Sequence, residues 1–339
     1  MTIEPAKSAP KVATASIGEL YFGLIAGQLA RTDEVFRQSL ASDVPFIEEA
    51  GEYIFKGGGK RMRPALVLLA AKMLERDGDE EVTYAAVVEL IHSATLIHDD
   101  IIDHSTLRRS KPTVNQVWGN SKTVLLGDWL YTTAMNMALS HGNLDVVRRL
   151  CEATLRMTEG ELLALDRLRA INLSRDEYFE IVERKTARLF AAAASVPAMM
   201  TPERQDAAVV LESYGRALGT CFQLVDDLLD FTARERELGK PVLSDLKEGK
   251  LTLPIILALP RIDDLRRGWV GAVLEDGAFD RVEPEQILEI VESEGTLEET
   301  QELARVHAAE AQKVLAFFPP SEARDALEFA PDFVLDRRH

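Results

Sequence analysis

The chain has 339 residues, of which 46% are hydrophobic, and its 56 acidic and 39 basic residues give a formal net charge of −17. This excess of negative charge excludes nonspecific nucleic-acid binding, which requires a basic surface. The two cysteines, Cys151 and Cys221, exclude a disulfide scaffold; both are predicted to be small core residues of a protein in a reducing compartment.

The first 15 residues lack the apolar core of a signal peptide, so we expect a flexible N-terminal tail over residues 1–15. No later apolar stretch approaches the roughly 18–20 residues that a membrane-spanning helix needs. The sequence therefore predicts a cytoplasmic protein without a transmembrane segment.

Helical periodicity dominates the rest of the chain, and no alternating strand pattern of useful length interrupts it. Glycine, proline and asparagine mark the breaks between helices. The expected helices cover residues 16–41, 45–56, 62–76, 81–104, 121–140, 144–169, 175–197, 203–232, 250–260, 284–293, 296–315 and 321–336. Because no Pro/Ser-rich linker divides them, we predict one all-α domain over residues 16–339, built as a large helical bundle.

A glycine-rich turn precedes the helix expected at 62–76. Gly57, Gly58 and Gly59 lead into a basic run that contains Lys60 and Arg61. Glycines let a backbone approach an anion, and the start of a helix adds a favourable dipole. The segment lacks the spacing of a P-loop and follows no strand, so it is a moderate indication of an anion site.

A cluster of aspartates ends the helix expected at 81–104. Asp99 and Asp103 are four residues apart and share a helix face, with Asp100 between them. His92 lies seven residues before Asp99 on the same stripe. A lone histidine in such a helix is more commonly structural, but this alignment favours a role at the site.

An arginine pair, Arg108 and Arg109, follows the first cluster, with Lys111 close behind. Arginine binds phosphate oxygens in a bidentate manner and does not lose its charge. A solvated loop is the alternative interpretation, and the short distance from the aspartates favours phosphate binding.

A second cluster with the same D-D-x-x-D spacing contains Asp226, Asp227 and Asp230, and Gln223 lies on the same stripe. Six carboxylates in apolar surroundings are costly unless positive charge neutralises them. Two such faces opposed across a cavity would form a cage for a hard cation such as Mg²⁺.

Further basic residues lie between and after the clusters. Lys185 and Thr186 begin an alanine-rich helical stretch. They either bind phosphate or form part of a surface turn. Lys240 and Lys250 flank a loop at 239–249, which is either a lid over the site or a solvated loop.

Seven segments of the chain, taken together and in order, resemble the trans-isoprenyl diphosphate synthases (polyprenyl synthetases). They are GGGKRMRP, VELIHSATLIHDDIID, LRRSKPTVNQVWGN, LLGDWL, ERKTARLF, FQLVDDLLDF and GKPVLSDLKEGKLTLPII. The resemblance covers the chain from about Glu19 to Arg338. It implies an all-α bundle of the isoprenoid synthase type, usually a homodimer, with its site in a deep central cavity.

The resemblance also implies a role for each matching residue. Magnesium, as three ions with substrate bound, would be held by Asp99, Asp103 and Asp226, with Asp100, Asp227 and Asp230 completing the clusters. Isopentenyl diphosphate would be bound by Lys60, Arg61, His92 and Arg109. The allylic diphosphate would be bound by Arg108, Lys185, Thr186, Gln223, Lys240 and Lys250.

The implied reaction is ionisation, condensation and elimination. The allylic diphosphate leaves as a carbocation forms, while Mg²⁺ and three side chains, Arg108, Lys185 and Lys240, stabilise the leaving group. The double bond of isopentenyl diphosphate attacks the cation, and the departing pyrophosphate removes the proton. The residues expected to carry catalysis are Asp99, Asp103, Asp226, Arg108, Lys185 and Lys240.

Product length is predicted from the helix that carries Asp99. One turn below this aspartate stand Ala94 and Thr95, which are too small to close a cavity. Met135 and Met157 are candidates for a deeper floor. Since each helical turn spans about 5.4 Å, roughly one isoprene unit, an open first turn predicts an all-trans product of about C35 to C50. A short-chain farnesyl or geranylgeranyl diphosphate synthase is the alternative.

The sequence departs from the family pattern at two positions, and two rival functions are considered beside prenyl transfer. Ser110 stands where the family usually has glycine, which predicts mild strain if that position requires a positive φ. His104 stands where an acidic or small polar residue is common. The rivals are a class I terpene cyclase and the non-catalytic subunit of a heteromeric prenyl synthase; the intact second aspartate cluster argues against both. We also expect a peripheral membrane contact for product release.

Overall fold

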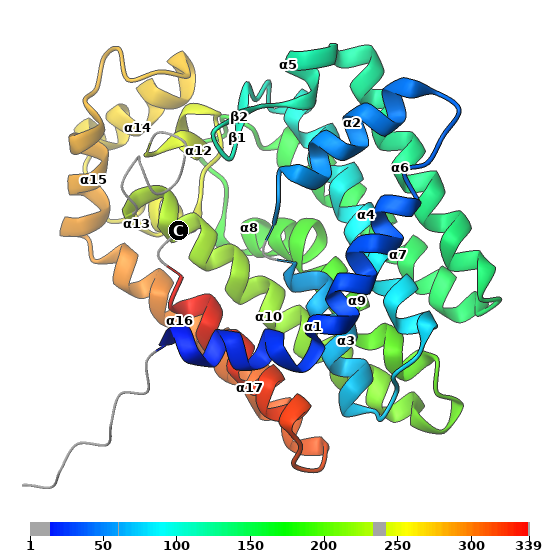
Figure 1. The fold of residues 1–339 in the computed structure, drawn as a ribbon. Helices are drawn as coiled ribbons and strands as arrows, with labels where there is room; N and C mark the ends of the chain where they lie inside the picture. The colour runs from blue at the N-terminus through cyan, green and yellow to red at the C-terminus, as the bar shows by residue number, and fades with distance from the viewer. Residues whose placement is uncertain (1–13, 60, 233–241, 338–339) are drawn as a thin grey trace, which may run out of the picture.

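The computed structural model describes residues 14–59, 61–232 and 242–337. Helices account for nearly all of its regular structure (Figure 1). The first half contains α1 (Thr14–Gln38), α2 (Pro45–Lys56), α3 (Met62–Met73), α4 (Asp79–Ile102), α5 (Val114–Trp118), α6 (Asn120–Ser140) and α7 (Leu144–Asp166). A two-stranded hairpin, β1 (Leu107–Arg108) and β2 (Lys111–Pro112), lies between α4 and α5.

The second half begins with α8 (Arg175–Val182), which continues through a π-helical turn, η1 (Glu183–Ala187), into α9 (Arg188–Met199). A short 3₁₀ turn, η2 (Pro202–Arg204), leads to the long helix α10 (Gln205–Thr232). The remaining elements are α12 (Ser244–Lys247), α13 (Leu253–Ala258), α14 (Asp264–Asp276), α15 (Pro284–Ser293), α16 (Thr296–Val314), η3 (Leu315–Phe317) and α17 (Glu322–Leu335).

The structure confirms the all-α class and most of the expected helices to within a few residues of their ends. Some expectations were wrong in detail. The helix expected at 175–197 is interrupted by the π-helical turn, and the helix expected at 250–260 is only the short α13. The 13-residue helix α14 was not predicted at all, although Asp263 caps its start and Gly277 ends it.

Helix α10 runs diagonally across Figure 1 and packs most extensively against α9 and α16. Helix α9 also touches α3 and α4, and it therefore lies between the two helices that carry the aspartate clusters. Small residues permit this close packing. A Cβ added at Gly219 of α10 would lie 2.7 Å from the Cα of Ala187, the last residue of η1, so a larger residue there would push this turn away from α10.

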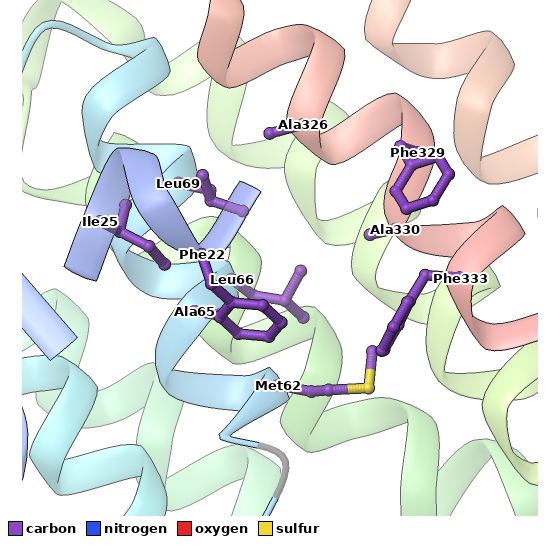
Figure 2. A pocket seen from close by; sticks show the side chains of 10 residues that line it. All are labelled: Phe22, Ile25, Met62, Ala65, Leu66, Leu69, Ala326, Phe329, Ala330 and Phe333. Atoms are coloured by element: carbon purple, nitrogen blue, oxygen red, sulfur yellow. The ribbon is translucent and has the colours of Figure 1, made fainter. Parts of the chain in front are cut away.

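An apolar gap of about 40 Å³ lies between α1, α3 and α17 (Figure 2). Met62 on α3 reaches across it toward the ring of Phe333 on α17. The other lining residues are Phe22, Ile25, Ala65, Leu66, Leu69, Ala326, Phe329 and Ala330. No residue of α4 lines this gap, so it is distinct from the deep central cavity expected beside the first aspartate cluster, which stays a prediction.

The two cysteines differ in their surroundings. Cys221 on α10 is buried, as predicted. The prediction for Cys151 was wrong, because it lies on the exposed side of α7 while its neighbour Leu150 fills the core. Within the described residues, no helix is both long enough and apolar enough to cross a membrane.

Candidate functional site

Both aspartate clusters lie at the C-terminal ends of long helices. Asp99 and Asp100 belong to the last turn of α4, and Asp103 follows that helix directly. The second cluster lies within the last two turns of α10, which ends at Thr232. The C-terminal end of a helix carries partial negative charge, so carboxylates there need positive charge nearby.

Two lysines supply positive charge to the first cluster. Lys185 Nζ lies 3.9 Å from Asp99 Oδ2 and forms a close ion pair with Glu161, while Lys250 Nζ lies 2.8 Å from Asp103 Oδ2. Burial raises the pKa of Asp99 to about 6 even though Lys185 opposes the shift. Burial therefore outweighs the stabilisation that Lys185 gives to the charged form of Asp99.

The arginine pair is presented by the hairpin. Arg108 donates from Nε to Asp100 Oδ1 at 2.8 Å, which neutralises a buried carboxylate. Arg109 Nη1 donates to the Gly57 carbonyl at 3.3 Å, so the adjacent side chains diverge. Arg109 and Ser110 form the two-residue loop with φ values of 52° and 60°. Such a turn favours glycine, so the strain expected at Ser110 has a physical basis.

In the second cluster only Asp226 is exposed, with 52% of its side chain accessible. Asp227 is buried, and it accepts hydrogen bonds from Tyr178 Oη at 2.5 Å and from Gln223 Nε2 at 2.8 Å. Thr186 donates in turn to Gln223 Oε1 at 2.8 Å. Burial raises the pKa of Asp227 to about 8. This chain of hydrogen bonds joins the π-helical turn to α10.

Asp230 is also buried, and it holds the start of α12. Its Oδ1 accepts from the Ser244 backbone N–H at 3.1 Å and from the Ser244 hydroxyl at 2.7 Å, and its Oδ2 accepts from the Asp245 N–H at 3.2 Å. The chain then continues to Lys250, which pairs with Asp103. Residues 242–250 thus connect the second cluster to the first.

The π-helical turn η1 places Lys185 and Thr186 toward the clusters. Extra backbone in a helix is common at functional sites because it redirects side chains. A Cβ added at Gly160 of α7 would lie 2.7 Å from the Lys185 backbone nitrogen, so the glycine permits α7 to approach the turn. This approach brings Glu161 to Lys185, a contact that the sequence analysis missed.

The basic run after the glycines divides into two environments. Arg61, with φ of 49°, points to Glu89 at 2.6 Å and to Asp33 at 3.1 Å. Arg63, on the first turn of α3, instead lies 3.0 Å from His92 Nε2 through its Nη1. Burial lowers the pKa of His92 well below its usual value, and Arg63 adds to this effect, so His92 is neutral and accepts from Arg63. Sequence reasoning missed Arg63 because only the helix start decides which arginine faces the histidine.

The described structure therefore brings together most of the expected site residues around α4, η1 and α10. Lys60 and Lys240 lie outside the described residues. Ala94 is buried, and Thr95 donates to the carbonyl of His92 within α4.

Carboxylate oxygens of this kind suit Mg²⁺. In the first cluster, Asp99 and Asp103 each face the positive charge of a lysine. Within the described part of the chain, no three acidic, histidine or cysteine side chains converge closely enough to hold an ion. Mg²⁺ is commonly held by one or two carboxylates together with substrate phosphates, and the residues present fit that mode of binding.

Comparisons with known proteins identify the family of the chain. The family model described as polyprenyl synthetase matches residues 44–291. The chain is 40% identical over 307 residues to the octaprenyl diphosphate synthase of Escherichia coli, covering 90% of this chain and 94% of that protein. It is also 35% identical to a short chain isoprenyl diphosphate synthase of Methanothermobacter thermautotrophicus, covering 91% and 95%.

Among solved structures, the chain is similar to a polyprenyl synthase from Caulobacter crescentus complexed with calcium and isoprenyl diphosphate. The TM-score is 0.90 at 34% sequence identity, and the match covers 99% of this chain and 100% of that one.

Proposed function

Since the chain belongs to the polyprenyl synthetase family and is a prenyltransferase of the isoprenoid synthase fold, we propose that it makes a long all-trans polyprenyl diphosphate of about C35 to C50. It would do so by repeated head-to-tail addition of isopentenyl diphosphate to an allylic diphosphate.

One observation carries this proposal: positive side chains gather in two separate places around α4. Lys185 and Lys250 lie at the end of the helix, against its aspartates. Arg63 of α3 lies against His92, which is about two helical turns before Asp99 on α4. Two diphosphates can therefore bind at once without sharing the same cations, which a condensation between two diphosphate substrates requires.

The residues that would hold magnesium are Asp99 and Asp103 on one side and Asp226 on the other. When bound, the ions would neutralise the allylic diphosphate and stabilise it as a leaving group. Asp100, Asp227 and Asp230 would support the cage from behind, because each is buried and already hydrogen-bonded within the protein.

The remaining side chains would bind and orient the substrates. The allylic diphosphate would be held by Arg108, Lys185 and Lys250, together with Thr186, Gln223 and Lys240. Isopentenyl diphosphate would be held by Arg109, His92, Arg63 and Lys60. Arg61 would contribute less to this binding, because its charge is already paired with Glu89 and Asp33. Neutral His92 can donate one hydrogen bond from Nδ1 while Nε2 accepts from Arg63.

Relatives include both long-chain and short-chain enzymes, so product length rests on this chain's own residues. Ala94 and Thr95 leave the first turn below Asp99 without a bulky side chain. We expect the growing chain to pass this turn and to stop deeper.

The test is to incubate the purified protein with Mg²⁺, the C10 allylic substrate geranyl diphosphate and labelled isopentenyl diphosphate and to separate the products by chain length. The wild type and Ala94→Ser should give long products, and Ala94→Tyr should give shorter ones. A wild type that stops at C15 or C20 would contradict the long-chain proposal, and no incorporation at all would contradict the function.

Large apolar side chains exposed on α6 and α7 support a homodimer. Leu125 and Leu139 share one face of α6, while Leu144, Leu155 and Leu162 share one face of α7. Large apolar side chains that share an exposed helix face suit an interface between subunits. Light scattering should give twice the chain mass for the wild type and a smaller mass for Leu155→Glu with Leu125→Glu; a monomeric wild type would refute the dimer.

A further inference from the structure

Lys250 is shared almost equally between two carboxylates, one inside the first aspartate cluster and one outside it. Its Nζ lies 2.8 Å from Asp103 Oδ2 and 2.9 Å from Glu248 Oε2. Glu248 and Lys250 belong to one anchored turn, because the carbonyl of Gly249 between them accepts from the Arg169 backbone N–H at 2.7 Å. The backbone therefore keeps Glu248 beside the lysine independently of Asp103.

Lys185 lies between two carboxylates in the same way, at the other end of the cluster. Its Nζ lies 3.9 Å from Asp99 Oδ2 and forms a closer ion pair with Glu161 of α7. Glu161 follows Gly160, whose lack of a side chain permits α7 to approach the π-helical turn, and only 13% of the Glu161 side chain is accessible. The contact therefore depends on the packing of two elements rather than on the meeting of two solvated side chains.

The two glutamates change the cost of freeing the aspartates of the first cluster. A metal cation and a lysine compete for the same carboxylate oxygens, so metal binding requires that the lysine move away. A largely buried charge that loses its partner is destabilised, and Lys185 and Lys250 have only 29% and 30% of their side chains accessible. Transfer of each lysine to a waiting glutamate therefore costs less than its release without a counter-ion.

We propose that Glu161 and Glu248 are positioning residues: each retains its lysine when the neighbouring aspartate binds Mg²⁺. This inference rests on the proposed function, in which the aspartates of the first cluster hold the metal. Without metal, each lysine is shared between its two carboxylates. With metal bound, the glutamate alone pairs with the lysine and keeps the ammonium group at the edge of the site, where the allylic diphosphate would bind.

The test measures equilibrium binding of Mn²⁺ alone to the full chain, by the loss of the electron paramagnetic resonance signal of the free ion. Mn²⁺ prefers the same oxygen ligands as Mg²⁺. Glu248→Gln should weaken Mn²⁺ binding roughly three- to ten-fold, because Lys250 then pairs with Asp103 alone. Lys250→Met should strengthen binding, because it removes the competing cation. When Lys250 is already replaced by Met, the loss caused by Glu248→Gln should fall below about two-fold, since the glutamate acts through the lysine.

Glu161→Gln and Lys185→Met form a second, independent cycle with the same expectation. Glu180→Gln is the matched control, because Glu180 pairs with Arg184 of the same π-helical turn at 2.6 Å and its substitution changes the net charge equally. This control should bind Mn²⁺ as the wild type does. Thermal unfolding shows whether each variant is folded; if Glu161→Gln is not, the more exposed Glu248 decides by its own cycle.

In steady-state kinetics, the Mg²⁺ concentration for half-maximal turnover should rise by a similar factor in Glu248→Gln, with kcat at saturating Mg²⁺ within about two-fold of wild type.

Unchanged Mn²⁺ affinity in the glutamate variants would overturn the proposal, and so would a wild type that does not bind Mn²⁺ alone. An equal loss with and without the lysine would also overturn it, because the glutamate would then act on the ion directly. In each of these cases a wild type that makes product leaves the proposed function standing. A wild type that binds Mn²⁺ but makes no product would overturn the proposed function instead.

Discussion

The two aspartate clusters have the same spacing in the sequence but different surroundings in the structure. In the first, Asp99 and Asp103 are partly exposed and each faces a lysine. In the second, only Asp226 is exposed, while Asp227 and Asp230 are buried in hydrogen bonds that hold other parts of the fold. An identical motif can therefore place two partly exposed carboxylates at the end of one helix and one at the end of another, while the remaining carboxylates act as buried hydrogen-bond acceptors within the fold.

The largest expected effect concerns the exposed members of both clusters. Asp99→Ala and Asp226→Ala should each lower kcat on the order of 1,000-fold, because a lost ligand leaves diphosphate charge unneutralised. Both variants should unfold at nearly the wild-type temperature. Steady-state kinetics over a range of Mg²⁺ concentrations checks this, and a loss of only a few-fold with unchanged Mg²⁺ dependence would refute the metal assignment.

Substitution of each arginine of the pair tests which of the two substrates that arginine binds. Arg108→Ala should raise KM for the allylic substrate roughly 10- to 100-fold, and Arg109→Ala should do the same for isopentenyl diphosphate. The reason is that Arg108 is tied to Asp100 whereas Arg109 turns toward Gly57. Kinetics with each substrate varied in turn measures the division, with Arg108→Lys as the charge-preserving control. Equal effects on both substrates would show that the pair acts as one unit.

Asp103 and Asp230 occupy equivalent positions in the two clusters, and their substitution distinguishes a metal ligand from a buried hydrogen-bond acceptor. Asp230→Ala should lower the free energy of unfolding by about 1–3 kcal/mol, because the N–H groups of Ser244 and Asp245 lose their buried acceptor. Asp103→Ala should change stability little and activity strongly. Urea unfolding of both variants, followed alongside turnover, is the measurement. If the two variants behave alike, the clusters are equivalent after all.

A pH dependence of stability is expected for the protein without metal. Burial raises the pKa of Asp227 to about 8, so the folded state binds a proton that the unfolded state has already lost above its ordinary pKa near 4. The free energy of unfolding should therefore fall as pH rises between about 4 and 8, by at most about 1.4 kcal/mol per pH unit. Asp227→Asn should flatten this dependence in urea titrations with EDTA. An unchanged slope in the variant would assign the effect to other groups.

The sequence allowed most of the fold to be predicted, because helical periodicity and capping residues mark the long helices. Helix α14 was missed because its charged surface weakens the apolar pattern, although Asp263 and Gly277 were visible signals at its two ends. The roles of Asp227 and Asp230 could not be predicted from spacing, since burial depends on Tyr178 and on α12, which lie elsewhere in the chain.

The arginines illustrate the same limit at the site. A run with alternating basic residues does not show whether Arg61 or Arg63 faces His92, because that depends on where α3 begins. Arg337 lies more than 100 residues after Asp226 in the sequence, and only the packing of α17 against α10 brings the two together. Local patterns predict elements and motifs well, whereas partners distant in sequence require the tertiary structure.

The apolar gap between α1, α3 and α17 has a consequence for the response of the protein to hydrostatic pressure. An unfilled space of about 40 Å³, lined by phenylalanine, leucine and alanine, is too apolar to hold an ordered water. Unfolding eliminates such a void and so decreases the volume of the system. The total volume decrease on unfolding is usually about 20–100 mL/mol, and voids contribute part of it. Compression should therefore loosen the packing of α17 against α1 and α3.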